Sequence, residues 1–339
     1  MQRFFRLRSR AGAALSLMGV VALATAIAAV GTSSAAAKTQ SGHLKIAYLS
    51  FAVNNSYDAP MLAAAKAVAA KNNATLQVFD ANNSPTTQYS QFQDAITGGG
   101  FSGIITQPIE STNLISLVKK AVAKGIKVVN MDQVMGPKLD TADVQVKGLS
   151  GNVTFDPLLM GEDLGALVVQ ACKAEKLKPC DVGYLYDIKA SALDVAIRNG
   201  FDLATKGKGV TVVSSGQDYF TPADGLTAVQ TMVQGNSSIN VIAGSDQGIE
   251  GAQRVSFSHK VALVGYGGSG AGIAGVKSGK WYGTIVQDPA SEGRVATQQL
   301  ISAIRTGVTY PGTNPLTTLP NGGIITKANV SQFKAEWAG

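Results

Sequence analysis

Short hydrophobic runs alternate with amphipathic segments from residue 44 to about residue 308. The runs are continuous rather than alternating, which is typical of strands buried on both faces, and the segments between them repeat their apolar positions with a helical period. This pattern predicts a parallel sheet covered by helices. In the first half we expect strands at 46–51, 75–80, 103–106 and 127–131, and helices at 60–71, 86–97 and 113–124.

A polar stretch with glycines, 136–151, has no period and is interpreted as a connector, after which the pattern starts again. Two successive doubly wound units predict an α/β protein with two parallel-sheet lobes. For the tail, 311–339, we expect turns, a short strand near Ile324 and a terminal helix. In the second half we expect strands at 181–186, 211–215, 241–243, 261–266 and 283–287, and helices at 158–174, 192–206, 225–234, 248–257, 270–277 and 292–306.

The first 37 residues have the pattern of a signal peptide. A basic segment, 3–10, precedes an apolar run, 11–30, and the small residues 33–37 follow. Cleavage after Ala37 would start the mature chain near Lys38, so we expect an exported protein in the periplasm or on the outside of the cell envelope. The alternative is an uncleaved anchor, because the apolar run is about long enough to span a bilayer.

Charge and composition favour a globular protein that does not bind nucleic acid. Hydrophobic residues make up 45% of the chain and charged residues 15%, with a net charge of +7. Four arginines within residues 3–10 carry much of that charge, and only about +3 remains for the rest of the chain. No stretch rich in Lys and Arg with interleaved aromatic residues is present, so nucleic acid is not an expected partner.

The two cysteines, Cys172 and Cys180, are close in sequence, and in an oxidising compartment we expect a disulfide between them. Two separate thiols are the alternative. The only histidines, His43 and His259, lie far from the cysteines, so no zinc site is expected. No cofactor is expected either.

The polar turn after the first strand, Asn54-Asn55-Ser56, precedes an alanine-rich helix. In open α/β sheets, small ligands bind outside the carboxyl ends of the strands, where this turn would lie. It offers neutral hydrogen-bonding groups beside the ring of Tyr57 and has no glycine-rich phosphate loop. That chemistry suits a polyhydroxylated, uncharged ligand.

The sequence offers little for catalysis. His259 lies in a polar turn and His43 near the start of the mature chain, and neither has the setting of a base in a cleft. There is no nucleophile elbow and no P-loop, so we expect a protein that is not an enzyme. The glycine run 265–270 matches G-x-G-x-x-G formally, with Asp288 at about the distance of a ribose-binding acid. A dinucleotide site and an exported enzyme therefore remain alternatives.

Several short motifs, in order, resemble those of the periplasmic sugar-binding proteins of the ribose-binding type, over about residues 44–325. Each motif is weak alone, and their order and spacing carry the resemblance. The motifs are Asn54-Asn55-Ser56-Tyr57, Asp80-Ala81-Asn82-Asn83, Gln107-Pro108, Asp132, Arg198-Asn199-Gly200-Phe201, Ser245-Asp246, Val264-Gly265-Tyr266 and Thr284-Ile285-Val286-Gln287-Asp288-Pro289.

The resemblance implies a monomeric substrate-binding component of an ABC importer, which would deliver its ligand to a membrane permease. It implies the type I periplasmic binding protein fold, in which two lobes joined by three crossing segments close on the ligand by a hinge. We expect crossings near 155–156, 287–288 and 317–320. The expected lobes are residues 44–155 with 288–318, and residues 156–287 with 319–339.

Carried over by position, the resemblance also implies a set of ligand-binding residues. Asp132 would accept hydrogen bonds from sugar hydroxyls, although a turn aspartate is the alternative. Asn55 would equally cap the next helix, Tyr57 and Phe220 would equally be core aromatics, and Gln287 would equally shape a turn before proline. The predicted set is Asn55, Tyr57, Asp58, Asp132, Gln133, Asp194, Phe220, Ser245 and Gln287.

Departures from the family pattern argue against ribose itself. Gln133 and Val195 stand where the ribose binders have arginines, and glycine follows Tyr266 where they have an aspartate. Asp58 replaces the second aromatic residue of the first motif. Each lost charge-assisted bond is worth roughly 1.5–3 kcal/mol when buried. We expect a sugar or polyol other than ribose, and the acids Asp58, Glu110 and Asp194 would also suit a ligand with a cationic group.

Two further roles share this fold. A LacI-type repressor would need a helix-turn-helix headpiece before the first strand, where this chain carries the signal pattern instead. A sensor that presents its closed form to a receptor uses the same closure as a transport protein, so the sequence does not separate those two roles.

Overall fold

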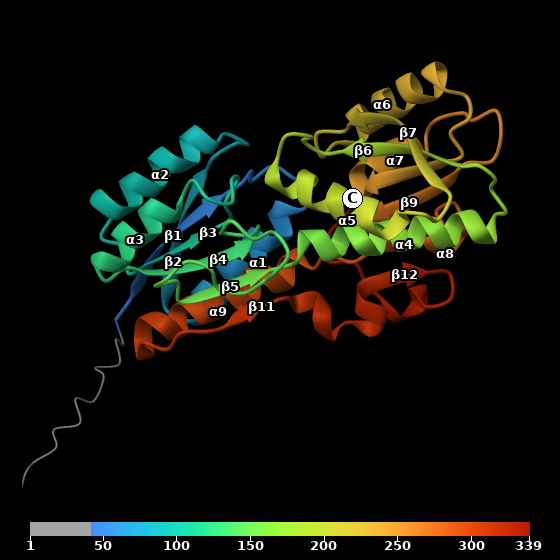
Figure 1. Cartoon of the computed structure of the whole chain (residues 1–339). Helices are drawn as coiled ribbons and strands as arrows, with labels where there is room; N and C mark the ends of the chain where they lie inside the picture. Colours follow the sequence, from blue (N-terminus) through green and yellow to red (C-terminus); the bar gives the residue numbers. More distant parts are fainter. Residues whose placement is uncertain (1–41) are drawn as a thin grey trace, which may run out of the picture. The chain divides into compact units, whose positions relative to one another are not determined.

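The computed structural model describes residues 42–339, and the expected export signal lies outside the described residues. Within the described part, the chain forms two six-stranded sheets (Figure 1). The first sheet has the order β11-β5-β4-β3-β1-β2, and every strand pair in it is parallel. Its strands are β1 (Leu44–Ser50), β2 (Ala74–Asp80), β3 (Gly103–Thr106), β4 (Lys127–Asp132), β5 (Gly151–Thr154) and β11 (Gly312–Thr313).

The second sheet repeats the winding of the first, with the order β7-β6-β8-β9-β10-β12. All of its pairs are parallel except β10 with β12. In both sheets the chain starts in an inner strand, moves to one edge and then returns past its starting point. Its strands are β6 (Cys180–Tyr186), β7 (Val210–Gln217), β8 (Val241–Ser245), β9 (Ala262–Tyr266), β10 (Gly283–Ile285) and β12 (Ile324–Thr326).

Helices cover both faces of the first sheet because its inner strands are apolar on both sides. Ile46 and Tyr48 of β1 pack against α1 (Asp58–Lys71) and α9 (Pro289–Thr306). Ala47 and Leu49 belong to the cluster under α2 (Pro85–Thr97) and α3 (Ile115–Ala123). The edge strand β2 is largely half-exposed, as expected of a sheet margin. The prediction of a two-lobed, helix-covered parallel sheet is therefore confirmed.

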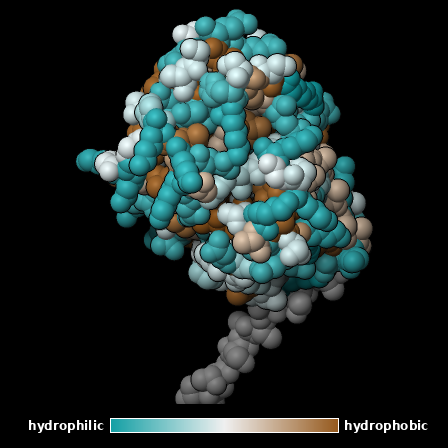
Figure 2. Space-filling model, turned by 90° about the vertical axis from the view of Figure 1, so that its right-hand side faces the viewer, coloured by the Kyte–Doolittle hydropathy of each residue, from teal (hydrophilic) through white to brown (hydrophobic). Residues whose placement is uncertain are grey.

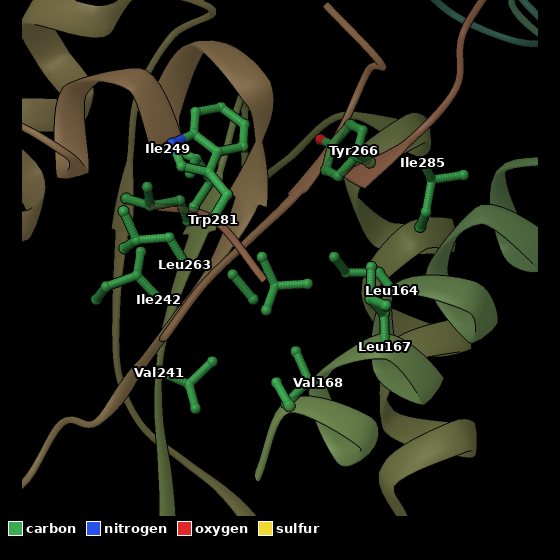
Figure 3. Close-up of a cluster of buried hydrophobic side chains, with 14 of the residues drawn as sticks. Leu164, Leu167, Val168, Val241, Ile242, Ile249, Leu263, Tyr266, Trp281 and Ile285 are labelled. Carbon is green, nitrogen blue, oxygen red and sulfur yellow. The ribbon is translucent and has the colours of Figure 1, made fainter. Parts of the chain in front are cut away.

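The second lobe is built in the same way. Figure 3 shows Leu164, Leu167 and Val168 of α4 in one buried cluster with β8 and β9 residues such as Ile242 and Leu263. Gly200 lets α4 and α5 approach closely, because a Cβ there would lie 2.0 Å from the carbonyl oxygen of Leu158. The helices are α4 (Pro157–Ala174), α5 (Ala192–Thr205), α6 (Pro222–Gly235), α7 (Asp246–Ala252) and α8 (Gly270–Ser278).

The chain passes between the two sheets three times. It leaves the first sheet after β5, returns between β10 and α9, and leaves again between β11 and β12. The crossings fall close to the expected positions at 155–156, 287–288 and 317–320. The three crossing segments of the predicted fold are therefore confirmed.

The surface is polar over the face in Figure 2, where hydrophobic residues form small separate patches. Among residues 42–339, no helix combines the length and the apolar character needed to cross a membrane.

One strand was not predicted, and one prediction was wrong. The connector ends at strand β5, whose short sequence Gly-Asn-Val-Thr carries little strand signal and is ordered by pairing with β4. The described tail has no terminal α-helix; it has three short 3-10 segments, Pro315–Thr318, Pro320–Gly323 and Val330–Gln332. Contacts with the rest of the protein hold the residues after the last of these segments in extended or bent conformations.

The C-terminal segment 333–339 contacts both lobes. In the second lobe, the backbone N–H groups of Gly270 and Ala271 donate to carbonyls of the segment, and Trp337 Nε1 donates to the Gly267 carbonyl at 2.8 Å. In the first lobe, the Trp337 ring lies edge-on to Tyr57, with 5.4 Å between centroids. Glu336 accepts hydrogen bonds from both Oγ and the backbone N–H of Ser291 on α9. The segment is therefore a non-covalent link between the lobes, beside the three covalent crossings.

Cys172 at the end of α4 and Cys180 at the start of β6 form a disulfide in the structure, with 5.9 Å between their Cα atoms. The bond closes a short loop between a helix and the next strand. The predicted pairing is present.

We expect the Cys172→Ala/Cys180→Ala variant to lose about 2–3 kcal/mol of the free energy of unfolding, because the open loop gains entropy in the unfolded chain. Denaturant titration of the two proteins measures the loss. Two free thiols in the mass spectrum of the purified, unreduced protein would contradict the pairing itself.

Candidate functional site

The carboxyl ends of strands from both sheets meet around one cavity. In the first sheet, the connections after the neighbouring strands β1 and β3 run in opposite directions, which is the point where the winding reverses. In the second sheet, the connections after β6 and β8 do the same. This is where ligands bind in open α/β sheets. The cavity is lined by Phe51, Asn55, Tyr57, Asp58, Gln107, Asp132, Gln133, Asp187, Leu193, Phe220, Ser245, Gln247, Tyr266 and Gln287.

Asp132, the last residue of β4, organises the wall from the first lobe. Its Oδ1 accepts from the Tyr57 hydroxyl, and its Oδ2 accepts from the side-chain amides of Gln107 and Gln133, all at 2.9 Å. The backbone of Asp132 has a positive φ of 62°, a conformation that non-glycine residues rarely adopt and that is concentrated at functional sites. The carboxylate is therefore held in place from three sides before any ligand arrives.

Gln107 connects Asp132 to a second carboxylate. Its Nε2 also donates to Asp58 Oδ1 at 2.5 Å, and its Oε1 accepts from the backbone N–H of Phe51 at 3.0 Å. Asp58 lies in the first turn of α1 and is 4% exposed. One amide thus bridges two buried carboxylates and fixes the start of the loop after β1.

These carboxylates are costly to ionise in the ligand-free protein. Burial, and then the charge of Asp132, hold the pKa of Asp58 well above its usual range. Burial also raises the pKa of Asp132, against the hydrogen bonds that it accepts. Glu292 on α9 lies against Asp132, and its pKa is raised by burial and by that neighbouring charge. The first-lobe wall is therefore a concentration of acids without a matching cation.

Asp187 is the central acid of the second-lobe wall and directly follows β6. Its Oδ2 accepts from the hydroxyl of Tyr266, whereas its Oδ1 is buried and receives no hydrogen bond. Burial and the charge of Asp194 raise the pKa of Asp187 to about 7. Asp218 lies against Asp187, and its own pKa is raised by burial and by that charge.

Phe220 is positioned by the same acids. Asp218 Oδ1 accepts from the backbone N–H of Phe220 at 2.9 Å, and Asp218 Oδ2 accepts from Ser245 Oγ at 3.0 Å. Phe220 has a φ of 58°, a strained conformation for an aromatic residue. Its ring meets Phe51 of the first lobe edge-on, with 6.3 Å between centroids. The two rings thus meet at the cavity from opposite lobes.

The cavity is lined by every predicted ligand-binding residue except Asp194. The Asp194 carboxylate is turned to the backbone instead, and accepts from the N–H groups of Asp187 and Ile188 at 2.9 Å. Glu110 and Val195 lie on a neighbouring groove outside this cavity. Asn55 Oδ1 accepts from the backbone N–H of Tyr57, so it shapes the turn as well as lining the cavity.

Six lining residues were not among the predicted ligand-binding residues. Asp187 and Gln107 each directly follow a strand, so the rule that placed Asp132 at a strand end would have found them too. Phe51 also directly follows a strand, β1, but its apolar side chain gives no sign of a ligand role, and nothing local in the sequence marks Leu193. The six are Phe51, Gln107, Asp187, Leu193, Gln247 and Tyr266.

The glycine run after β9 surrounds an internal carboxylate. Asp246 accepts from the backbone N–H and the hydroxyl of Ser269, both at 2.7 Å, and from Thr284 Oγ1 at 2.6 Å. A Cβ on Gly265 or Gly272 would lie within 2.3 Å of the Asp246 side chain. Since Asp246 occupies the N-terminus of α8, where a dinucleotide site would bind phosphate, the run is explained by packing. In residues 42–339 no group of His, Cys, Asp and Glu side chains is arranged to hold a metal ion.

Comparison with known proteins gives the family. Residues 46–307 match the model of the periplasmic binding protein domain. The chain belongs to the periplasmic binding protein family. The resemblance to the ribose-binding type is thereby confirmed, as is the expectation of a binding protein rather than an enzyme.

Individual relatives are distant. The ribose import binding protein RbsB of Bacillus subtilis is 25% identical over 250 residues, which are 73% of this chain and 77% of the relative. The D-allose-binding periplasmic protein of Escherichia coli is 26% identical over 66% of this chain and 72% of its own. A solved ABC transporter solute-binding protein from Bacillus halodurans C-125, with bound myo-inositol, has a TM-score of 0.74 at 18% identity, covering 88% of this chain and 99% of that protein.

We expect the ligand-free protein to become less stable as the pH rises from about 4 to 7. A carboxyl whose pKa is higher in the folded than in the unfolded chain binds more protons when folded, so the free energy of unfolding is highest at low pH and falls as the pH rises through the folded pKa. The relevant folded values are about 7 for Asp187 and about 6 for Asp246, against about 4 in the unfolded chain.

Denaturant unfolding of the ligand-free protein across this range measures the effect. Asp187→Asn should lose less stability with rising pH, whereas the exposed Asp94→Asn should behave as the unmodified protein does. A rise in stability between pH 5 and 7 would show that these acids do not control the pH dependence.

Proposed function

We propose that the protein is an exported solute-binding protein that captures a small polar ligand, a sugar or polyol, by closure of its two lobes, and delivers it to the membrane permease of an ABC importer. The observation that carries this proposal is the convergence of polar side chains and aromatic rings, from strand ends of both lobes, on one cavity. Acids and amides would bind hydroxyl groups, and the rings would cover the apolar face of the ligand.

The lining of the cavity suits a monosaccharide or a cyclic polyol, because it combines acids and amides for hydroxyl groups with aromatic rings for an apolar face. The relatives described above are named for ribose and allose, and the similar solved structure holds myo-inositol. These compounds share a compact frame with several hydroxyl groups. That shared chemistry, rather than any one of the compounds, is what we propose for this chain.

Closure of the two lobes on the ligand is proposed because the residues of the site are divided between them. Asp132 and Gln107 belong to the first lobe, whereas Asp187 and Phe220 belong to the second, so only a closed form brings all four to one ligand. We propose that residues 44–155 with 288–318 and residues 156–287 with 319–339 move as the two rigid bodies. We further propose that the signal at the N-terminus directs export and is cleaved near Ala37.

A thermal-shift screen over pentoses, hexoses, polyols and nucleosides tests the function. We expect at least one sugar or polyol to raise the unfolding midpoint without being consumed, because a ligand that binds only the folded state stabilises it. Chromatography of the same mixtures measures consumption. Conversion of the ligand to a product, or binding confined to nucleosides, would contradict the proposal.

Asp132→Asn tests the first-lobe wall. We expect at least about a tenfold loss of affinity by calorimetry, because a charge-assisted hydrogen bond to a ligand hydroxyl is lost. Asparagine tolerates the positive φ at this position better than alanine, so folding should be retained. Asp132→Ala should also abolish binding, with a further loss of stability. Unchanged affinity in Asp132→Asn would remove Asp132 from the site.

A further inference from the structure

The charge of the cavity distinguishes this site from a pocket for a neutral sugar. Its lining includes the three carboxylates Asp58, Asp132 and Asp187, and it includes no Lys, Arg or His. All three are at most 4% exposed. None of them takes part in a salt bridge within residues 42–339, where the ion pairs lie at the surface. The cavity thus brings together several acids with no cation of the protein to balance them.

Asp187 supplies an independent observation that points to a ligand. It is fully buried and lines the cavity, and its Oδ1 receives no hydrogen bond from an N–H group or a hydroxyl, although the carboxyl group of Asp218 lies beside the Asp187 carboxylate. Nearly all buried polar atoms in proteins are paired, so an unpaired carboxylate oxygen at a cavity wall marks a place for a donor. Asp132, by contrast, already accepts three hydrogen bonds from the protein. Asp187 therefore has more unmet acceptor capacity than Asp132, and Asp58 accepts only from Gln107 at its Oδ1.

A neutral hydroxyl would satisfy this oxygen without balancing the charge. A protonated amine does both, since it brings three N–H donors and one positive charge to acids that are costly to bury alone. The rings of Phe51, Tyr57, Phe220 and Tyr266 line the same cavity, and aromatic faces attract cations. The amides of Gln247 and Gln287 and the amide oxygen of Gln133 remain for neutral hydroxyl groups, whereas Gln107 is bonded within the protein.

We propose that the ligand is an amino sugar or amino polyol, a small hydroxylated frame with one protonated amine, and that Asp187 from the second lobe and Asp58 from the first lobe bind the ammonium group. This inference rests on the proposed function and specifies its ligand class. On closure, the ammonium group would bring charge balance to carboxylates of both lobes. Ligand binding and closure would therefore be coupled through the same ion.

Pairs of compounds that differ in one amine test the proposal. D-Glucosamine with D-glucose, D-galactosamine with D-galactose, and D-glucamine with D-glucitol are compared at pH 7 and constant ionic strength by thermal shift and calorimetry. We expect an amine to bind at least about tenfold more tightly than its neutral partner, the size of a charge-assisted hydrogen bond. N-Acetyl-D-glucosamine, in which the charge is removed, should lose the advantage of D-glucosamine.

Variants assign the preference to these residues. Asp187→Asn should lose about tenfold in affinity for the amine and little for its neutral partner, and Asp58→Asn should act in the same direction. Asp94→Asn removes an equal charge from the exposed face of α2 and should keep the preference. Near-UV circular dichroism shows whether each variant is folded. If Asp187→Asn does not fold, the test is made with Asp58→Asn.

The outcomes separate the two proposals. If neutral sugars or polyols bind and no amine binds more tightly than its partner, the amine is wrong and the solute-binding function stands. If neither the amines nor the neutral sugars and polyols bind, both proposals fail. An amine preference that survives in both folded Asp187→Asn and Asp58→Asn would overturn the assignment of the acids.

Discussion

The direction of the strands is the constraint on which the site depends. Every neighbouring strand pair in both sheets is parallel except β10 with β12, so most strands of a sheet end at the same edge. The loops at that edge carry Asp132 and Gln107 in the first lobe and Asp187 and Ser245 in the second. Three crossings of the chain connect these sheets, and a cavity lined by both results. The winding thus determines which residues meet, and the loop sequences determine what they bind.

A cluster of buried acids is tolerated here because the first lobe surrounds it with donors. Tyr57, Gln107 and Gln133 donate to Asp132, and the same Gln107 donates to Asp58. These bonds lower the cost of ionisation without cancelling it, since the pKa of each acid stays raised. In the second-lobe wall, Asp187 accepts from one hydroxyl, that of Tyr266, and its Oδ1 receives no N–H or hydroxyl donor. The asymmetry between the two walls makes Asp187 the natural anchor for a donor on the ligand.

The sequence predicts the fold well because apolar periodicity and strand direction are local signals. It places inner strands such as β3 and β6 within about a residue, and the family resemblance names Asp132 and Gln287, both of which line the cavity. The sequence wrongly places Asp194 at the cavity. Its carboxylate accepts from the backbone N–H groups of residues 187 and 188 instead, and the sequence does not record this side-chain orientation. It also misses Phe51, because no local pattern records that the other lobe meets this ring.

The C-terminal segment places a tryptophan where its fluorescence depends on both lobes. The chain has two tryptophans, and Trp281 is enclosed in the core of the second lobe. Trp337 is different, because it bonds to the second lobe at Gly267 while its indole lies on Tyr57, whose hydroxyl reaches Asp132 in the cavity. Any movement of one lobe against the other changes the surroundings of that indole and leaves those of Trp281 alone. If the lobes close as proposed, the intrinsic fluorescence of the unlabelled protein would report that movement through Trp337, with Trp281 as an internal reference.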